Sequence, residues 1–199
     1  MTVVPAAARD RLARVITEVA APWVWCVGLP YAVGIGGKWS LLSGLAWATL
    51  IAVGAAVVPM ALILRGIRAG RVQSGHHVTS RAERYVPLVG AIASVGAVIG
   101  VLAMFSAPRP MIGVAAVMLA TVITALAITH WWKISMHTAV ASGSVVVLTA
   151  FYGIGAAALW AVVAAIAWSR VRIDHHTTGQ VIAGIALGTA TGLLFDVVA

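Results

Sequence analysis

Acidic side chains are scarce in this chain, which holds 5 Asp and Glu residues against 13 Lys and Arg residues over a length of 199. Charged residues of both signs make up only 9% of the sequence, whereas hydrophobic residues make up 62%. A soluble globular domain carries roughly 25% charged residues, so this composition excludes that class. The composition predicts an integral membrane protein.

Cysteine is almost absent as well, since Cys26 is the only one in the sequence. A single cysteine excludes an intrachain disulfide. No H-E-x-x-H pattern occurs, and the carboxylates of Glu83 and Asp174 are the only ones near the polar segments described below. We therefore expect neither a bound metal nor another cofactor.

Long apolar runs dominate what is present. A membrane-spanning helix needs about 20 apolar residues at a rise of about 1.5 Å each. Seven segments qualify: 15–35, 39–64, 86–105, 111–129, 135–151, 154–168 and 178–198. They predict an all-α, polytopic transmembrane bundle of six to seven helices, forming one integral membrane domain over residues 1–199. Pro22 and Pro30 interrupt the first segment, which we expect to be bent or re-entrant.

Three polar segments separate these runs, at residues 65–84, 133–137 and 169–180. An even number of predicted crossings lies between each pair, so all three are expected on one side of the membrane. That side carries most of the basic residues, and the other carries only Lys38 and Arg109. The excess of positive charge predicts a cytoplasmic face, in a bacterial inner (plasma) membrane. The net charge of +8 then favours membrane lipids and phosphorylated substrates as partners, rather than nucleic acid.

The third polar segment contains the most informative pattern. Ionisable groups beside a membrane-spanning run are costly and indicate function by default. Ser169 and Arg170 are followed by His176, which directly precedes a predicted helix whose N-terminus would favour an anion. This pattern resembles the third motif of the type-2 phosphatidic acid phosphatase superfamily, S-R-x5-H-x3-D, with Gln180 in place of the aspartate.

The resemblance implies that His176 is the nucleophile and that Arg170 binds the phosphate. Gln180 takes the position that orients the nucleophile, in what resembles a divergent branch of the superfamily. Asp174 is the alternative orienting group: it either pairs with Arg172, which we favour, or replaces the missing carboxylate.

The second polar segment resembles the P-S-G-H motif of the same superfamily in part. Ser135 and His137 match it, whereas Ile134 and Met136 replace the proline and the glycine. The resemblance implies that His137 protonates the leaving group and that Ser135 contacts the phosphoryl oxygens. Lys133 adds a cation beside them, and we expect it to bind the substrate phosphate as well.

The first polar segment is compared with the superfamily pattern K-x6-R-P. Arg84 matches the arginine, while His77 and Tyr85 stand at the lysine and proline positions. Arg81 lies three residues before Arg84, so the two would share a helix face. We expect Arg84, Arg81 and His77 to bind phosphate, and the resemblance covers about residues 65–199.

Taken as a whole, the resemblance implies a membrane lipid phosphatase. Such an enzyme hydrolyses a lipid or polyprenyl phosphate or diphosphate through a phosphohistidine, without a metal. A lipid phosphotransferase on the same fold is an alternative. A transporter that uses His137, His176 and Asp174 as a proton relay is another, but the polar segments lie at helix ends rather than mid-membrane, which argues against it.

A stripe of glycines runs along the last apolar segment. Gly184, Gly188 and Gly192 recur every fourth residue, so they share one helix face. Small residues at this spacing allow two membrane helices to approach closely. We therefore predict that another helix packs against this face.

Overall fold

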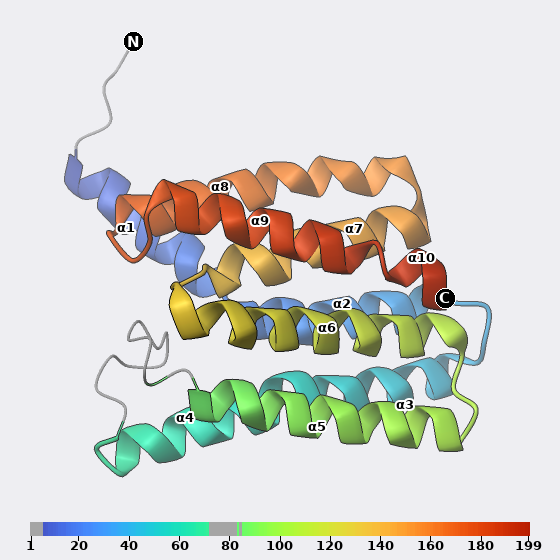
Figure 1. Ribbon diagram of the computed structural model, residues 1–199. Helices are drawn as coiled ribbons and strands as arrows, with labels where there is room; N and C mark the ends of the chain where they lie inside the picture. The colour runs from blue at the N-terminus through green and yellow to red at the C-terminus, as the bar shows by residue number, and fades with distance from the viewer. Residues whose placement is uncertain (1–5, 72–82, 84) are drawn as a thin grey trace.

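The computed structural model describes residues 6–71, 83 and 85–199, and all regular structure in these ranges is helical. The helices form an elongated bundle in which most of them run the length of the molecule (Figure 1). The predicted all-α, polytopic membrane bundle is confirmed.

Within the described ranges, five helical spans are long and apolar enough to cross a membrane. The first of them is continuous although it includes a π-helical turn, η1, and the fourth begins with a 3-10 turn, η3. The spans are α3–η1–α4 (Leu41–Ala52, Val53–Val57, Val58–Arg68), α5 (Tyr85–Met104), α6 (Arg109–Trp131), η3–α8 (Ile154–Leu159, Trp160–Arg172) and α9–α10 (Thr178–Gly192, Phe195–Val198). The shorter apolar helix α7 (Met136–Tyr152) lies among them.

The first predicted segment is a pair of helices, α1 (Ala6–Val19) and α2 (Pro22–Gly36), that meet at 47°. The bend is confirmed, and it falls just before Pro22 because a residue that precedes proline disfavours the helical conformation. Pro30 lies inside α2, which continues through it. The predicted start at residue 15 is nine residues too late, because the first turns of α1 are polar and carry no apolar run.

Helix α7 is the central element of the bundle. It contacts α2, α6, α8 and α9, and its buried residues are mostly small, such as Ala139, Ser142 and Gly143. A larger apolar core is formed by residues of α2, α3, α5, α6 and α7. Figure 1 shows α8 and α9 on one flank of α7 and the α3–α4 and α5 spans on the opposite flank.

The predicted close approach of a helix to the glycine stripe is confirmed, and the neighbour is α7. A Cβ atom at Gly188 would meet the Ala139 carbonyl oxygen and the Ser142 hydroxyl. Two hydroxyls also donate across this contact, from Thr138 to the Val181 carbonyl at 3.1 Å and from Ser142 to the Ile185 carbonyl at 3.2 Å. Close packing and interhelical hydrogen bonds are what hold helices together in lipid.

Helices α7 and α9 run parallel, so both begin at the same end of the bundle (Figure 1). The end of α4, the start of α5, and the loops 132–135 and 173–177 lie at that end too. We call it the site end. The loops at 37–40, 105–108 and 153 lie at the opposite end.

Candidate functional site

His176 lies immediately before α9 and is 6% exposed. Its Nδ1 atom is 3.0 Å from Gln180 Oε1, and the same oxygen accepts a hydrogen bond from the Thr177 backbone N–H at 3.3 Å. The Thr177 side chain accepts in return from the Gln180 N–H, which completes a capping box at the start of α9. This cap holds the carboxamide in place beside the imidazole.

The partner of His176 decides its tautomer. A backbone N–H can only donate, so the side-chain atom of Gln180 that faces it is the carbonyl oxygen. That oxygen needs a donor at His176 Nδ1. In this tautomer of the neutral imidazole the proton is on Nδ1 and the lone pair is on Nε2.

Arg170 is the most buried large polar side chain of the site, at 1% exposure. It lies in the last turn of α8, and its carbonyl oxygen accepts from the backbone N–H groups of His175 and His176, both at 3.2 Å. Asp174 has φ of +56°, the left-handed conformation that closes this turn. The turn places Arg170 and His176 close together although five residues separate them.

Asp174 and Arg172 do not pair as we expected. Arg172 binds Asp10 of α1 instead, with Nη2 and Oδ1 2.8 Å apart. Asp174 is an exposed turn residue, and the atom beside His176 Nδ1 belongs to Gln180. Near this ion pair, Thr17 of α1 and Ser169 of α8 share a buried hydrogen bond at 3.2 Å, which fastens α1 to the helix end that carries Arg170.

His137 lies in the first turn of α7 and is 4% exposed. Ser135, at the N-cap of that helix, is fully buried, and its backbone N–H donates to the Gln180 carbonyl at 3.2 Å. The Ser135 hydroxyl does not cap the helix and has no hydrogen-bond partner among the described residues. Leaving a buried hydroxyl without a hydrogen bond costs free energy, unless a bound ligand supplies the partner.

Lys133 connects two loops of the site end. Its Nζ atom donates to the His175 carbonyl oxygen at 2.7 Å. The residue therefore ties the loop before α7 to the loop before α9. It is not among the residues that line the cavity described next.

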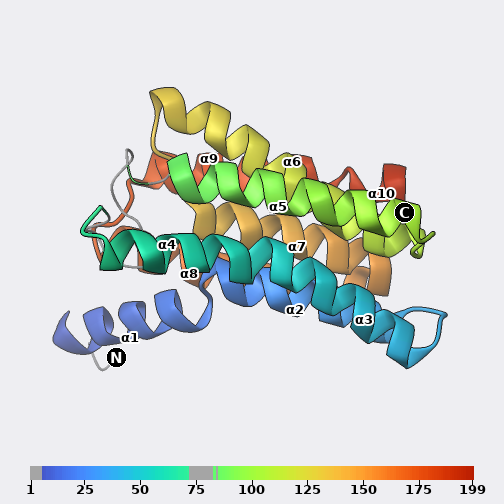
Figure 2. The ribbon, with the colours of Figure 1, turned by 90° about the horizontal axis from the view of Figure 1, so that it is seen from below.

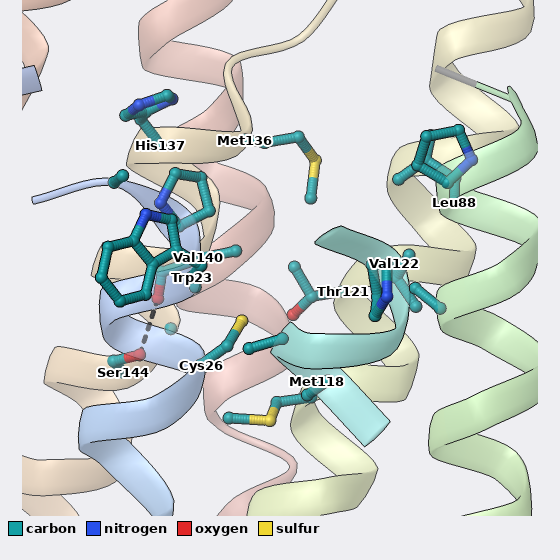
Figure 3. A pocket seen from close by; sticks show the side chains of 18 of the residues that line it. Trp23, Cys26, Leu88, Met118, Thr121, Val122, Met136, His137, Val140 and Ser144 are labelled. Carbon is teal, nitrogen blue, oxygen red and sulfur yellow. Dashed lines mark hydrogen bonds between the residues drawn. The ribbon is translucent and has the colours of Figure 1, made fainter. Parts of the chain in front are cut away.

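An apolar cavity of about 200 Å³ is lined by residues of the second and third polar segments. His137, Arg170 and His176 all line it, and Figure 3 shows His137 at one end with Cys26 and Met118 farther along. Apolar residues form nearly all the rest of its wall. They come from α2, η1, α4, α5, α6 and α7: Trp23, Cys26, Leu29, Ala56, Pro59, Met60, Ile63, Leu88, Ala91, Val95, Val117, Met118, Val122, Met136 and Val140.

The cavity walls were not anticipated from the sequence. Membrane helices are apolar on all sides, so hydropathy does not indicate which face of α2 or α4 lies inside. Pro59 follows the π-helical turn of its span. Such turns frequently occur at functional sites, so this part of the span was a local indication of the cavity.

The first polar segment, residues 65–84, is described only in part. Arg84, Arg81 and His77 lie outside the described residues. Among the residues on either side of them, Pro87 and Leu88 at the start of α5 line the cavity. Of the remaining predicted residues, His137, Arg170 and His176 line the cavity, and Gln180, Ser135 and Lys133 support it. Asp174 does neither.

The arrangement is suited to an anion. Two parallel helices, α7 and α9, begin at the site, and the N-terminal backbone N–H groups of a helix favour negative charge. Arg170 adds a buried, permanent positive charge. Within the described ranges, no group of three or more His, Cys, Asp and Glu residues could hold a metal ion.

Comparisons of the chain with protein-family models, with curated proteins and with solved structures found no match.

Proposed function

We propose that this membrane protein is a lipid phosphatase that hydrolyses a lipid or polyprenyl phosphate or diphosphate through a phosphohistidine. One observation supports this proposal above the others: His137 of the second polar segment and Arg170 and His176 of the third line a single apolar cavity. The resemblance to type-2 phosphatidic acid phosphatases assigns those same three residues to leaving-group protonation, phosphate binding and nucleophilic attack.

The polar end of the cavity would hold the phosphoryl group. Catalysis of phosphoryl transfer depends mainly on positioning and on stabilising charge at the phosphoryl oxygens. Arg170 provides charge, and the first turns of α7 and α9 provide backbone N–H groups. The Ser135 hydroxyl, buried at the N-cap of α7, would be a further donor to an oxygen of the substrate, although Ser135 is not among the residues that line the cavity.

The apolar part of the cavity would hold the lipid tail. Its wall is made of Leu, Val, Met and Ala side chains, with few polar groups. Ligand sites usually combine such a wall with a few convergent polar groups. Helices α2 and α4 both contribute to the wall, and no residue of α4 is fully buried. The space between these two helices is therefore the proposed entrance for the tail from the membrane.

The reaction begins with in-line attack of His176 Nε2 on phosphorus. A bond forms between Nε2 and phosphorus, and the bond from phosphorus to the leaving oxygen breaks. Protonated His137 gives its proton to that oxygen, so the lipid departs as a neutral alcohol, or as a lipid phosphate if the substrate is a diphosphate. Gln180 keeps the Nδ1 proton of His176 in place throughout.

Water completes the cycle. Neutral His137 accepts a proton from the attacking water, whose oxygen bonds to phosphorus as the bond to His176 Nε2 breaks. Inorganic phosphate leaves, and both imidazoles return to their starting states. Arg170 neutralises charge on the phosphoryl oxygens in both steps.

The site end is proposed to face the cytoplasm of a bacterium, from its inner membrane. Among the described residues, nine Lys and Arg residues lie at that end and two, Lys38 and Arg109, at the other. The bias in short loops follows the positive-inside rule. The nine are Arg9, Arg11, Arg14, Arg65, Arg68, Arg71, Lys133, Arg170 and Arg172.

The test is release of inorganic phosphate from a panel of lipid phosphates by the purified protein, beside His176→Ala. We expect activity in the presence of a chelator and a loss of several orders of magnitude in the variant. His175→Ala is the matched control, because the neighbouring imidazole does not line the cavity and the variant keeps the carbonyl that binds Lys133.

Two outcomes would contradict the proposal. Activity of His176→Ala within a few-fold of the parent would exclude His176 as the nucleophile. Transfer of phosphate to a second lipid without release of free phosphate would identify a phosphotransferase instead.

A further inference from the structure

Helix α1 has a composition that separates it from every other long helix of the bundle. Five of its 14 residues are charged, and a helix of this length is too short to cross a membrane by itself. It leaves the axis of α2 by 47° and extends beyond the site end (Figures 1 and 2). The helix lies at the site end, beside the last turns of α8.

One face of α1 is occupied by the protein itself. Ala13 and Thr17 are buried against α8, and Thr17 hydrogen-bonds to Ser169 there. Asp10, on the edge of the same face, pairs with Arg172 at 2.8 Å. These contacts fix the rotation of α1 about its axis and decide which residues point away from the bundle.

A second face of α1 is apolar and exposed. Leu12, Val15 and Val19 are 52%, 51% and 65% exposed, and their spacing of three and four residues places them on one strip. Trp23, at the start of α2, is 47% exposed and lies beyond the end of this strip. Tryptophan is typical of the boundary between headgroups and acyl chains.

Arginines lie on both sides of this strip. At 100° per residue, Arg9 falls on one flank and Arg11 and Arg14 on the other, and all three are exposed. Glu18 is the one acid on that second flank; it lies one turn after Arg14, and Arg9 and Arg11 lie farther from it. Apolar residues flanked by arginines are the pattern of a helix that lies in the membrane interface.

We propose that α1 binds the surface of an anionic leaflet, with Leu12, Val15 and Val19 inserted at the headgroup boundary and Arg9, Arg11 and Arg14 on lipid phosphates. Charge complementarity selects this occupant. If the same strip paired with its copy in a second molecule, arginines of the two helices would be brought together, and like charges disfavour such a contact. This inference concerns lipid binding and does not depend on catalysis.

The experiment places a fluorophore on the apolar strip of the full-length protein. Leu12→Cys in a Cys26→Ala background is labelled with an environment-sensitive dye and reconstituted in phosphatidylcholine nanodiscs, with or without phosphatidylglycerol. Some of the lipids carry bromine near the headgroup, which quenches a dye at that depth. We expect quenching that at least doubles with phosphatidylglycerol and falls again as salt is added, because salt screens the arginines.

Neutralising the arginines of α1 tests their role. Arg9→Gln, Arg11→Gln and Arg14→Gln together should remove the dependence on phosphatidylglycerol while leaving thermal unfolding of the protein within a few degrees of the parent. Arg65→Gln, Arg68→Gln and Arg71→Gln form the control, since they remove the same charge from the site end but not from α1.

Three results would overturn the proposal. A dye that is not quenched in any lipid mixture would place the strip in water. Quenching that changes neither with the phosphatidylglycerol content nor with the salt concentration would show an apolar contact without anion binding. Dye emission that depends on the number of protein copies per disc would identify a second copy as the occupant. The salt titration needs no arginine variant, so it decides the matter even if the triple variant does not fold.

Discussion

His176 Nδ1 lies 3.0 Å from Gln180 Oε1, and the same oxygen accepts the Thr177 backbone N–H at 3.3 Å. One carboxamide thus caps α9 and orients the imidazole at its start. An amide can hold the Nδ1 proton, but it carries no charge to stabilise an imidazolium. A carboxylate at this position would do both.

Replacing Gln180 separates these two roles. Glutamate can also complete a capping box, so Gln180→Glu should fold as the parent does. Its negative charge favours the protonated imidazole of His176, and the acidic limb of the pH profile of kcat/KM should move to higher pH. Gln180→Ala loses the cap and the orienting contact, and should lower kcat by about 10²-fold or more without that displacement. A pH profile of Gln180→Glu that superimposes on the parent's would contradict the contact.

Substitution of His137 should affect substrates according to their leaving group. A general acid contributes about 10² to 10⁴-fold when the leaving oxygen is strongly basic. His137→Asn should therefore lose that much on an alkyl lipid phosphate and far less on an aryl phosphate, whose leaving oxygen needs no proton. The measurement is kcat for the two substrates side by side. Equal losses on both would show that His137 has a role other than proton donation.

Lys133 is expected to hold the loop before α9 in place, in addition to any contact that it makes with the substrate phosphate. Its ammonium donates to the His175 carbonyl at 2.7 Å, so Lys133→Met removes this tie. We expect faster amide hydrogen exchange at residues 173–177 in the absence of substrate, read by mass spectrometry. If Lys133 served only the phosphate, exchange in that state would match the parent.

Filling the cavity should discriminate among substrates by tail length. Ala91 is buried in the cavity wall on α5, and Ala91→Phe would reduce the space for a tail. We expect KM for a long-chain lipid phosphate to rise by about tenfold or more, with little change for a short water-soluble ester, since a few buried methylenes at about 0.8 kcal/mol each account for that factor. Val89→Phe, on the exposed face of the same helix, should change neither value. Equal KM effects from the two variants would place the tail elsewhere.

The contact between α7 and α9 should be intolerant of added volume. A Cβ atom at Gly188 meets the backbone oxygen of Ala139, so Gly188→Ala forces the two helices apart. Overpacking of this kind costs about 1–3 kcal/mol. We expect a lower Tm and lower activity, because the two helix starts carry His137 and His176. Gly100→Ala on α5 meets no atom within 4 Å and should leave Tm within error or slightly higher.

Much of the fold followed from the sequence alone. The apolar runs predicted the spans that the structure contains, the prolines predicted the bend between α1 and α2, and the glycine stripe predicted a close helix contact. Each of these is a local property, because hydropathy, a missing N–H or a missing Cβ acts over a few residues. The parity of the crossings also put the polar segments at one end before any packing was known.

The sequence predicted some features of the candidate site, and others depended on the tertiary structure. His137, Arg170, His176 and Gln180 were selected from spacing, but their roles remain proposals. The expected pair of Asp174 with Arg172 was wrong, because Asp10 lies 162 positions earlier and only folding brings α1 beside α8. No local pattern contains that contact.

The amino-acid sequence by itself determined that the chain enters a membrane, where it bends, and which polar residues flank its helices. Only the tertiary structure decided that one cavity connects His137, Arg170 and His176, that Lys133 holds a loop, and that one strip of α1 is left exposed. When a helix is apolar on all sides, its sequence pattern does not indicate which face packs against a neighbouring helix. That choice is made by the packing of whole helices, through contacts between residues far apart in the chain.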